Sequence, residues 1–513
     1  MDTPRYRPVR VGACLAAEVQ QRADGSVLLQ AIEPLAPFPA RLSDRLQLWA
    51  NRHPERTLAA QRSAEGGWRQ LSYADMLGRA RSLGQALVDL GLNAERPVLI
   101  LSDNDLEHLS LMLAALWVGV PTVSVSPAYS LISTDHARLR HIAQASTPGL
   151  VFASDERFAA AINAVLPADV PALLTRGSVP GRASLSMASL LATVPDGGES
   201  QAHLASGPDS IAKLMFTSGS TRQPKGVVVT QRMWCANQQQ IQQAMSFLAD
   251  TPPVIVDWLP WNHTFGGNHN LGLVLYNGGT HYIDEGKPTP QGMAATLRNL
   301  AEISPTVYFN VPKGFDELVG AMDRDAALRD RFFARLQAFE CGGAGLSAST
   351  LEAFHRHAEA SVGERIKLIA GLGMTETAPS CTLSMRDPAR AGCIGLPLPG
   401  VEVKLVPVDG KLEVRFRGPN VMPGYWREPE LTRAAFDEEG FYCTGDAARF
   451  VDEQDPQQGL MFDGRIAEDF KLSTGTFVSV GPLRAKVVAQ GFPFVQDAVV
   501  TGINRDEIGL MLI

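Results

Sequence analysis

The 513-residue sequence has few cysteines, no recognisable signal peptide and no repeated segment. Its six cysteines form no Cys-x-x-Cys pair, which argues against a structural zinc site. Their scatter along a long chain is typical of free thiols in a reducing compartment. The N-terminus lacks the apolar run that a secretory signal needs. These absences predict a cytoplasmic protein.

The sequence also lacks an unbroken hydrophobic run long enough to cross a membrane. The most apolar stretch covers residues 109–125, and Gly119 and Pro121 interrupt it. Residues 109–118 suit a buried helix and residues 122–125 suit a strand, whereas a membrane-spanning helix needs about 20 apolar residues. We therefore expect no membrane span.

An excess of positive charge is absent as well. Lys and Arg number 46 against 54 Asp and Glu, which gives a net charge of −8. This balance argues against a surface built mainly to hold nucleic acid or anionic lipid. Hydrophobic residues make up 45% and charged residues 19%, as in ordinary globular proteins. The length suggests two to four compact units.

What the sequence does contain is an alternation of helix and strand patterns. Apolar residues recur on one helical face between residues 72 and 90, and Ser72 with Asp75 forms a plausible capping box. Short apolar runs predict strands at 98–101, 122–125, 149–153 and 172–174. Helical patterns lie between them at 105–118 and near 157–165. This alternation is typical of βαβ units, so we predict an α/β fold.

The pattern changes along the chain and suggests domain boundaries. Residues 1–40 are expected to be irregular, and residues 41–464 to form a large body of βαβ subdomains. Its last part, about 386–464, is β-rich, with a hairpin around Asp409-Gly410. Asp463-Gly464-Arg465 is expected to be a turn at a further boundary. Residues 465–513 are few for a domain, so we expect them to be the start of a small α+β C-terminal domain, apparently truncated.

The densest chemical signal is Thr217-Ser218-Gly219-Ser220-Thr221-Arg222-Gln223-Pro224-Lys225-Gly226. It follows the apolar residues 214–216, as a loop leaving a strand does. Small hydroxyl and glycine residues let backbone N–H groups converge on phosphate oxygens, and Lys225 adds a positive charge. The spacing is not that of a Walker A loop. On composition alone, an ordinary surface turn stays an alternative.

Three further clusters are weak individually. Glu376, within residues 370–377, has the oxygen ligand that Mg²⁺ prefers, although Thr-Glu is also common at helix starts. Asp446, within residues 442–446, is placed to accept hydrogen bonds from ribose hydroxyls or to sit in an ordinary turn. His263, within residues 258–267, lies among aromatic residues and glycines, where a structural histidine is the commoner case.

Together, in this order, the clusters resemble those of the adenylate-forming superfamily, which includes acyl-CoA synthetases, peptide-synthetase adenylation domains and luciferases. Gly342-Gly343-Ala344-Gly345-Leu346 and Asp463-Gly464-Arg465 are similar to two more motifs of that family. The resemblance covers about residues 40–513. Within the superfamily, residues 230–233, 256–268 and 470–481 look most like bacterial feruloyl-CoA synthases.

The resemblance implies the adenylate-forming enzyme fold and a two-step reaction. A carboxylic acid attacks ATP to give an acyl-AMP, and coenzyme A then takes the acyl group as a thioester. The expected substrates are 4-hydroxycinnamic acids (ferulate, p-coumarate and caffeate), with Mg²⁺ as the metal cofactor. Phenylpropanoid degradation is the implied context.

The resemblance also implies roles for individual residues. The catalytic set would be His263, Thr375, Glu376 and Lys225, with Glu376 as the Mg²⁺ ligand. ATP or AMP would be bound by Thr217, Ser218, Gly219, Ser220, Thr221, Lys225, Gly343, Ala344, Gly345, Leu372, Gly373, Met374, Thr375, Asp446 and Arg465. The acyl pocket would use Trp261, His263, Phe265 and Met374. The hinge would lie at Ala467 and Glu468.

The sequence departs from the family pattern at three points. Arg222 stands where the phosphate loop usually has glycine, and Ala467 where the hinge is usually Asp or Lys. The catalytic lysine expected near the end of the C-terminal domain does not occur before Ile513. Two alternatives therefore stay open: a nucleotide or acyl-AMP binding protein without turnover, and a ligase for another aryl or medium-chain acid. A homodimer is likewise left open.

Overall fold

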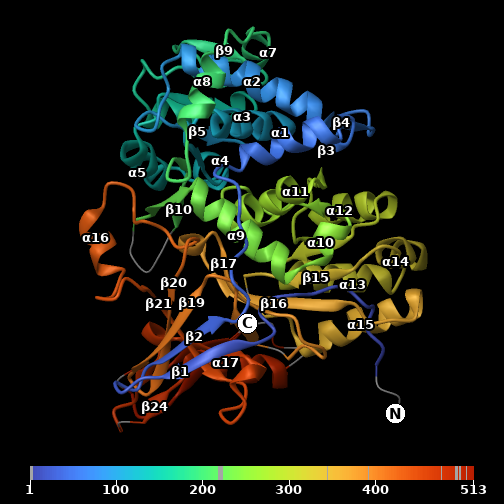
Figure 1. The fold of residues 1–513 in the computed structure, drawn as a ribbon, viewed down its shortest axis with the longest axis vertical. Helices are drawn as coiled ribbons and strands as arrows, with labels where there is room; N and C mark the ends of the chain where they lie inside the picture. Colours follow the sequence, from blue (N-terminus) through green and yellow to red (C-terminus); the bar gives the residue numbers. More distant parts are fainter. Residues whose placement is uncertain are drawn as a thin grey trace.

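The computed structural model describes residues 4–217, 223–343, 345–390, 392–474, 476–491, 495, 498–503 and 505–513. Those residues form the α/β fold that the sequence predicts, built on three large β-sheets and two small ones. In Figure 1 the upper part of the molecule is made of blue and teal elements, the lower part of the orange strands together with the blue strands β1 and β2, and α9 (Gln231–Ala244) lies between the two parts.

The upper part contains a seven-stranded sheet of order β11-β10-β6-β5-β7-β8-β9. All its strand pairs are parallel except β10–β11, which form an antiparallel hairpin. The strands are β5 (Val98–Leu101), β6 (Thr122–Ser124), β7 (Leu150–Ala153), β8 (Ala172–Leu174), β9 (Ser184–Ser186), β10 (Ile211–Thr217) and β11 (Lys225–Thr230). The predicted βαβ units are therefore confirmed.

Three of the helices around these strands, α2, α3 and α6, lie where the sequence predicts them. Helix α2 (Tyr73–Asp89) begins at Ser72, and the capping box between Ser72 and Asp75 is present. Helix α3 (Leu106–Trp117) is buried along its whole length, which explains its unbroken apolar run. The others are α4 (Ala128–Leu131), α5 (Ala137–Ser146), η1 (Glu156–Phe158), α6 (Ala159–Val165), α7 (Met187–Leu191) and α8 (Gly198–Ala205).

A four-stranded sheet of order β12-β13-β3-β4 lies beside these helices. Its strands are β3 (Thr57–Arg62), β4 (Trp68–Ser72), β12 (Val254–Asp257) and β13 (Thr280–Ile283). Around it lie α1 (Ser43–Arg52), α10 (Phe247–Asp250), the π-helix η2 (Phe265–Asn270), α11 (Leu271–Asn277) and α12 (Pro290–Glu302). The segment that contains His263 thus leaves the carboxyl end of β12 and enters η2.

The largest sheet has eleven strands in the order β1-β2-β19-β20-β21-β22-β18-β17-β16-β15-β14. Its strands are β1 (Ala17–Gln21), β2 (Val27–Ala31), β14 (Val307–Asn310), β15 (Ala338–Cys341), β16 (Lys367–Gly373), β17 (Ser380–Ser384), β18 (Cys393–Pro397), β19 (Glu402–Val408), β20 (Lys411–Arg417), β21 (Tyr442–Phe450) and β22 (Leu460–Arg465). Its helices are α13 (Pro312–Met322), α14 (Ala326–Phe333), α15 (Ala348–Val362), η3 (Thr375–Thr377), α16 (Pro429–Ala434) and η4 (Pro456–Gln458).

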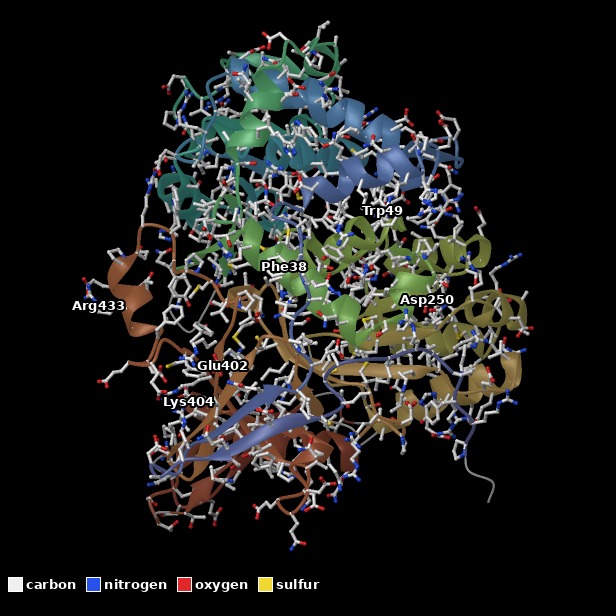
Figure 2. The ribbon with its side chains drawn as sticks, in the orientation of Figure 1. Phe38, Trp49, Asp250, Glu402, Lys404 and Arg433 are labelled. Atoms are coloured by element: carbon white, nitrogen blue, oxygen red, sulfur yellow. The ribbon has the colours of Figure 1, made fainter. Side chains whose placement is uncertain are left out.

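The structure corrects the expectation that residues 1–40 are irregular. Strands β1 and β2 form a hairpin, and β2 pairs with β19, 372 positions later at Gln30 and Glu402. The Gln30 amide of β2 donates to Glu402 of β19 over 2.8 Å. Figure 2 labels Glu402 on this lower sheet. A strand whose partner is so distant leaves only a short local pattern in the sequence.

The β-rich part differs from the sequence-based prediction at one of its two predicted turns. The hairpin around Asp409-Gly410 is confirmed, with φ of 49° and 82° at these two residues, as a type I′ turn requires. Residues 463–465, by contrast, are not a turn but the end of strand β22. Beyond them come η5 (Ile466–Glu468), β23 (Phe470–Lys471), β24 (Phe477–Val478), α17 (Val480–Gly491), β25 (Ala498–Thr501) and β26 (Gly509–Leu512).

Candidate functional site

The predicted phosphate loop connects the two strands of the β10–β11 hairpin. Thr217 ends β10 and Lys225 begins β11, and the two residues lie directly opposite each other. Ser218, Gly219, Ser220, Thr221 and Arg222 lie outside the described residues. The Thr217 hydroxyl oxygen is buried and has no hydrogen-bond partner in the part of the chain that is described. A buried hydroxyl without a partner fits a site for an external polar group such as a phosphate.

The second predicted motif lies beside this hairpin. Thr375 and Glu376 are both buried in the short helix η3 that follows β16. The Tyr425 hydroxyl donates to Glu376 Oε1 over 3.1 Å, and the Lys225 ammonium lies 4.7 Å from the centre of the Tyr425 ring. Tyr425 therefore connects the hairpin lysine to the acidic residue, although the two are far apart in sequence.

Sequence reasoning missed Tyr425, and backbone bonds show why it lies there. Its neighbour Trp426 donates its backbone N–H to the Gly226 carbonyl over 2.7 Å, and Met422 donates to the Glu376 carbonyl over 2.8 Å. Residues 422–426 are thus hydrogen-bonded to both motifs. Burial, followed by the charge of Glu376, raises the pKa of Tyr425, so its hydroxyl keeps its proton and remains a donor.

The donor set around Glu376 fits one divalent cation bound together with substrate phosphates. Glu376 supplies one buried carboxylate, to which the Tyr425 hydroxyl donates at Oε1 and with which the Tyr442 hydroxyl also interacts. Among the described residues no three acidic, histidine or cysteine side chains gather in a metal cage. Mg²⁺ commonly uses one or two carboxylates and completes its shell with phosphate oxygens and water. A single buried carboxylate therefore suffices for this kind of site.

Three buried amide side chains hold the loop that contains Glu376. Asn420 donates to the backbone carbonyls of Thr377 and Ser380, each over 3.0 Å. Asn237 donates to the Ser380 carbonyl over 2.7 Å, and Gln240 donates to Asn420 over 3.2 Å. Since buried polar groups are costly unless paired, this satisfied network fixes the loop against α9.

The predicted adenine-binding segments lie on neighbouring strands. Strands β15 and β16 are parallel and paired, so Gly343 and Gly345, just after β15, come close to Leu372 and Gly373 at the end of β16. Ala344 lies outside the described residues. Gly343 has φ of 81°, which favours glycine. A side chain at Gly373 would come within 2.1 Å of the Pro379 carbonyl. Both glycines are therefore required by the backbone.

Asp446 and Arg465, the predicted ribose contacts, form a cross-strand pair. They are directly opposite each other in β21 and β22, and Arg465 Nε lies 3.2 Å from Asp446 Oδ1. Asp446 is buried, whereas the Arg465 side chain is 62% exposed. Burial raises the pKa of the Asp446 carboxyl, and the charges of Glu468 and Glu376 act in the same direction, against Arg465. The influence of Glu376 places Asp446 within electrostatic range of the second motif.

His263 lies where the chain enters η2. Its Nδ1 accepts a hydrogen bond from the Phe265 backbone N–H over 3.3 Å, so the proton of a neutral ring belongs on Nε2. The residue is exposed at the surface, and the surrounding protein lowers its pKa by desolvation. His263 therefore presents a neutral imidazole with an N–H donor.

The residues predicted for the acyl pocket divide into two environments. Phe265 packs edge-on against Phe309 of β14, and a side chain at Gly342 would come within 2.5 Å of its ring. Met374 is half-buried beside η3. Trp261 is 1% exposed and packs between the His108 and His281 rings. The contacts therefore bring Phe265 to the β14–β15 edge and place Trp261 in the core.

The π-helix η2 is held by side chains from two other elements. Lys213 of β10 donates to the Gly267 carbonyl over 2.5 Å, and its ammonium group lies 3.7 Å from the centre of the Trp234 ring. Trp234 and Gln238 of α9 both donate to the Asn268 carbonyl, over 2.8 and 3.2 Å. A π-helix leaves carbonyls poorly paired within the helix, and these donors satisfy them.

The predicted hinge residues Ala467 and Glu468 form helix η5 just after Arg465. The next residue, Asp469, is buried and forms an ion pair with Lys411 of β20. Its Oδ1 also accepts the Val480 backbone N–H over 2.8 Å. Lys411 donates in addition to the Asp463 carbonyl over 2.6 Å. A buried ion pair thus connects the large sheet to the segment that follows the hinge.

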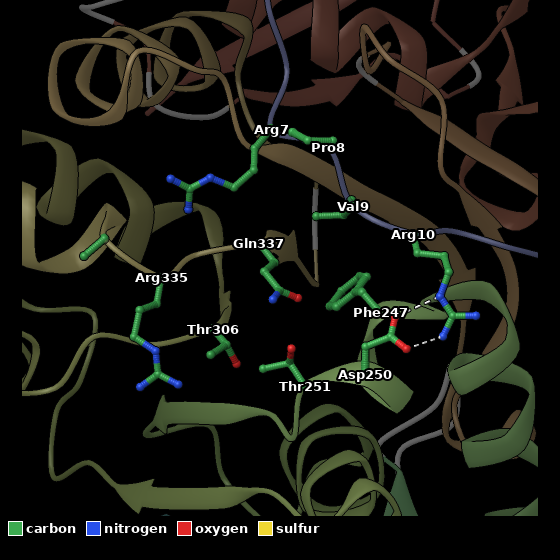
Figure 3. A pocket seen from close by; sticks show the side chains of 11 residues that line it. Arg7, Pro8, Val9, Arg10, Phe247, Asp250, Thr251, Thr306, Arg335 and Gln337 are labelled. Atoms are coloured by element: carbon green, nitrogen blue, oxygen red, sulfur yellow. Dashed lines mark hydrogen bonds and ion pairs between the residues drawn. The ribbon is translucent and has the colours of Figure 1, made fainter.

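A cavity of about 460 Å³ lies elsewhere in the molecule (Figure 3). Thr306 and Gln337, which line it, immediately precede β14 and β15, whereas Gly342 follows β15. The cavity therefore lies at the amino ends of these parallel strands, whereas the predicted motifs lie at their carboxyl ends. Arg10 and Asp250 on its rim are joined by two hydrogen bonds of 2.8 Å. We do not assign this cavity to the nucleotide.

Comparison with known proteins adds three findings. The sequence model of the family described as "AMP-binding enzyme" matches residues 46–426. The chain is 26% identical, over 88% of its length and 78% of the relative's, to the long-chain-fatty-acid–CoA ligase FadD15 of Mycobacterium bovis. It is 25% identical, over 88% of its length and 82% of the relative's, to the 3-hydroxybenzoate–CoA ligase of an Aromatoleum species.

The fold comparison agrees with this grouping. The structure superimposes on a long-chain-fatty-acid–CoA ligase (FadD1) from Archaeoglobus fulgidus with a TM-score of 0.70, at 19% identity. The superposition covers 94% of this chain and 92% of the other. At such low identity it shows a shared fold.

No helix in the described part of the chain is long and apolar enough to span a membrane.

Proposed function

The chain belongs to the AMP-binding enzyme family, and we propose that it is an ATP-dependent acid–CoA ligase that works through an acyl-AMP intermediate. The curated relatives that act as CoA ligases support this class. The observation that carries the proposal is the convergence of Lys225, Tyr425 and Glu376, which joins a basic hairpin to a buried carboxylate.

In the first half-reaction the acid's carboxylate attacks the α-phosphorus of ATP and pyrophosphate leaves. Lys225 and Thr217 would hold the β- and γ-phosphates, and Thr375 the α-phosphate. Bound Mg²⁺ would be held by Glu376 and would offset charge on the phosphates. This kind of displacement depends on positioning and charge neutralisation more than on covalent chemistry by the protein.

The other groups would position the nucleotide and the acyl chain. Asp446 and Arg465 would bind the ribose hydroxyls, and Gly343, Gly345, Leu372 and Gly373 would pack on adenine. His263, which presents an Nε2–H, would donate a hydrogen bond near the junction of carboxylate and phosphate. In the second half-reaction the thiol of coenzyme A attacks the acyl carbon and AMP leaves.

We further propose that the acid is a 4-hydroxycinnamate such as ferulate, p-coumarate or caffeate. Residues 256–268 and 470–481 resemble feruloyl-CoA synthases, and Phe265 with Phe309 offers aromatic surface at the β14–β15 edge. A ligase for 3-hydroxybenzoate among the relatives shows that aryl acids occur within this family. Fatty-acid ligases among the relatives make a medium-chain acid the alternative.

Two assays test the proposal on the purified full-length protein. Acid-dependent exchange between ATP and labelled pyrophosphate measures acyl-AMP formation, and thioester absorbance with coenzyme A measures the whole reaction. We expect both with ferulate, and weaker signals with octanoate. Tight ATP binding by calorimetry, with no exchange for any acid in a panel of aryl and fatty acids, would instead support a binding protein without turnover.

A further inference from the structure

A histidine and a glutamate lie buried below Phe265 and take no part in the roles assigned above. His269 is on η2, and its ring lies 5.4 Å from that of Phe265. Glu340 is on β15, and His269 Nε2 lies 3.6 Å from Glu340 Oε2, too far for a good hydrogen bond. Their side chains are 1% and 11% exposed.

Neither of the two facing atoms is satisfied. His269 Nε2 and Glu340 Oε2 are both buried without a hydrogen-bond partner among the described residues. Buried polar groups in proteins are nearly always paired, and the exceptions often mark sites for a ligand. Several other buried polar atoms of the described residues also lack a partner, but these two lie 3.6 Å from each other.

Neighbouring hydrogen bonds show which ring nitrogen of His269 carries a proton. Asn270 donates its amide N–H to Asp257 Oδ2 over 2.9 Å, so its amide oxygen is left as an acceptor. That oxygen lies 2.9 Å from His269 Nδ1, which must therefore carry the proton. In a neutral ring, Nε2 is then an acceptor that points toward Glu340.

The register of the sheet shows which side of β15 the glutamate occupies. Glu340 pairs with Phe309 on one side and with Ile369 on the other, and paired residues of parallel strands share a face. Gly342, two residues on, belongs to the same face and abuts Phe265. Glu340 is thus a buried carboxyl on the same face of β15 as Gly342, the residue that abuts the ring predicted to contact the acyl group. A second charged residue on this face, Lys367 of β16, has partners of its own, since it donates to the Met385 carbonyl and pairs with Asp387.

The charge state of the glutamate completes the pattern. Burial raises the pKa of Glu340, with only His269 acting against it. A protonated carboxyl donates one hydrogen bond, and His269 Nε2 accepts one. A hydroxyl group can accept the first bond and donate the second. A charged ammonium group, which only donates, or a carboxylate, which only accepts, would not match both.

We propose that His269 and Glu340 form a hydroxyl-recognition pair that selects acids bearing a hydroxyl at the end remote from the carboxylate. The inference rests on the proposed ligase function and adds its specificity-determining residues. A site built to pair a hydroxyl rejects the analogue that lacks it, because its buried polar atoms are then left unpaired.

The test compares two acids that differ by that hydroxyl, 4-hydroxycinnamate and cinnamate. We expect wild-type kcat/KM for thioester formation to favour 4-hydroxycinnamate by about tenfold or more. In Glu340→Leu the preference falls to within about twofold, mainly through KM, whereas Glu340→Gln retains part of it because an amide can still donate. Glu199→Gln, which changes a buried carboxylate on α8, keeps the wild-type preference.

The outcomes separate this inference from the proposed function. Equal kcat/KM for the two acids in the wild type, or an unchanged preference in Glu340→Leu, would overturn the recognition pair and leave the ligase intact. Absence of thioester and of pyrophosphate exchange with every acid would overturn the ligase itself. If Glu340→Leu does not fold, the wild-type ratio and Glu340→Gln still decide the question.

Discussion

Glu376 is the residue on which the proposed chemistry depends most directly. Glu376→Gln keeps the side-chain volume and an acceptor for the Tyr425 hydroxyl, but it removes the charge that would face the metal. We expect acid-dependent pyrophosphate exchange to fall by about 10²–10³-fold while the unfolding temperature stays close to that of the wild type. Glu352→Gln, an exposed change on α15, should leave the exchange rate unaltered. Full activity in Glu376→Gln would remove Glu376 from the mechanism.

His355 is a buried residue whose effect is on stability. Its ring packs edge-on against Tyr6, and burial, assisted by Arg365, lowers its pKa to about 4. The unfolded chain binds this proton near pH 6.5 and the folded chain only near pH 4, so the unfolded state holds more protons in between. The stabilising contribution is therefore complete above pH 6.5 and is lost as the pH falls toward 4.

Replacing the His355 ring tests the predicted loss of stability as the pH falls. In His355→Phe, the free energy of unfolding should depend less steeply on pH between 6.5 and 4, by about 1.4 kcal/mol per pH unit. Urea unfolding at pH 5 and pH 7 gives the difference. The exposed His53→Phe should keep the wild-type slope, and an identical slope in His355→Phe would show that the buried ring titrates normally.

At this scale the sequence predicted individual residues better than their partners. Thr217, Lys225, Glu376, Asp446 and Arg465 stand out because hydroxyl, charged and glycine residues cluster around them. Tyr425 carries no such signal, because its role depends on a contact made only when residues 422–426 cross the β10–β11 hairpin. Asn237, Gln240 and Asn420, whose amide groups bond to the Glu376 loop or to one another, likewise carry no signal in the sequence.

Among the elements, the π-helix η2 is the least predictable from sequence. Its local pattern of glycines and asparagines suggests a loop. The helix exists because Lys213, Trp234 and Gln238 donate to its carbonyls from β10 and α9. Strands β5, β6, β7 and β8 of the seven-stranded sheet, by contrast, follow from their own apolar runs, since parallel strands buried on both faces are continuously hydrophobic. Strand β9 and helices α4, α5, α7 and α8 were not predicted.

Lys213→Met tests the support for this element. Burial holds the pKa of Lys213 well below its usual value, and no carboxylate among the described residues pairs with it. The substitution removes a donor from the Gly267 carbonyl, so we expect a loss of about 1–3 kcal/mol in the free energy of unfolding. Lys313→Met, which breaks an exposed pair with Glu317 on α13, should change stability by less than about 0.5 kcal/mol. A stabilised Lys213→Met would show that burying the amine costs more than its bond contributes.

For the whole molecule, the connection between the large sheet and the segment after the hinge depends on Lys411. Lys411→Met leaves the buried Asp469 carboxylate without its cation, which is strongly destabilising locally. We expect faster proteolysis within residues 466–480 at an unchanged unfolding temperature for the rest of the chain, measured by limited digestion and mass spectrometry.

The matched control for this prediction is Lys404→Met. Lys404, labelled in Figure 2, pairs with Asp437 and Glu439 and so lies within the large sheet and its neighbouring loop. The Lys404→Met substitution should not accelerate cleavage at residues 466–480. Equal cleavage rates in Lys411→Met and the wild type would show that Asp469 is held by other contacts.

Long-range pairing is also where the sequence-based prediction of the whole molecule was wrong. Residues 1–40 carry little periodicity, and the partner of β2 lies near position 402. The end of β22 looks like a turn because Gly464 interrupts it, yet its pairing with β21 brings Arg465 opposite Asp446. Neither pairing leaves a local pattern, so both required the structure.

The β2–β19 pairing sets limits on how the gene can be shortened for protein production. A clone that begins at residue 41, where the sequence alone places the start of the body, would lose β1 and β2 and expose the edge of β19 along Glu402–Leu405. Unpaired edges of this kind promote association between chains. Purification tags and truncations at this end therefore have to stay ahead of Ala17, even though every residue proposed to bind nucleotide lies more than 180 positions further along.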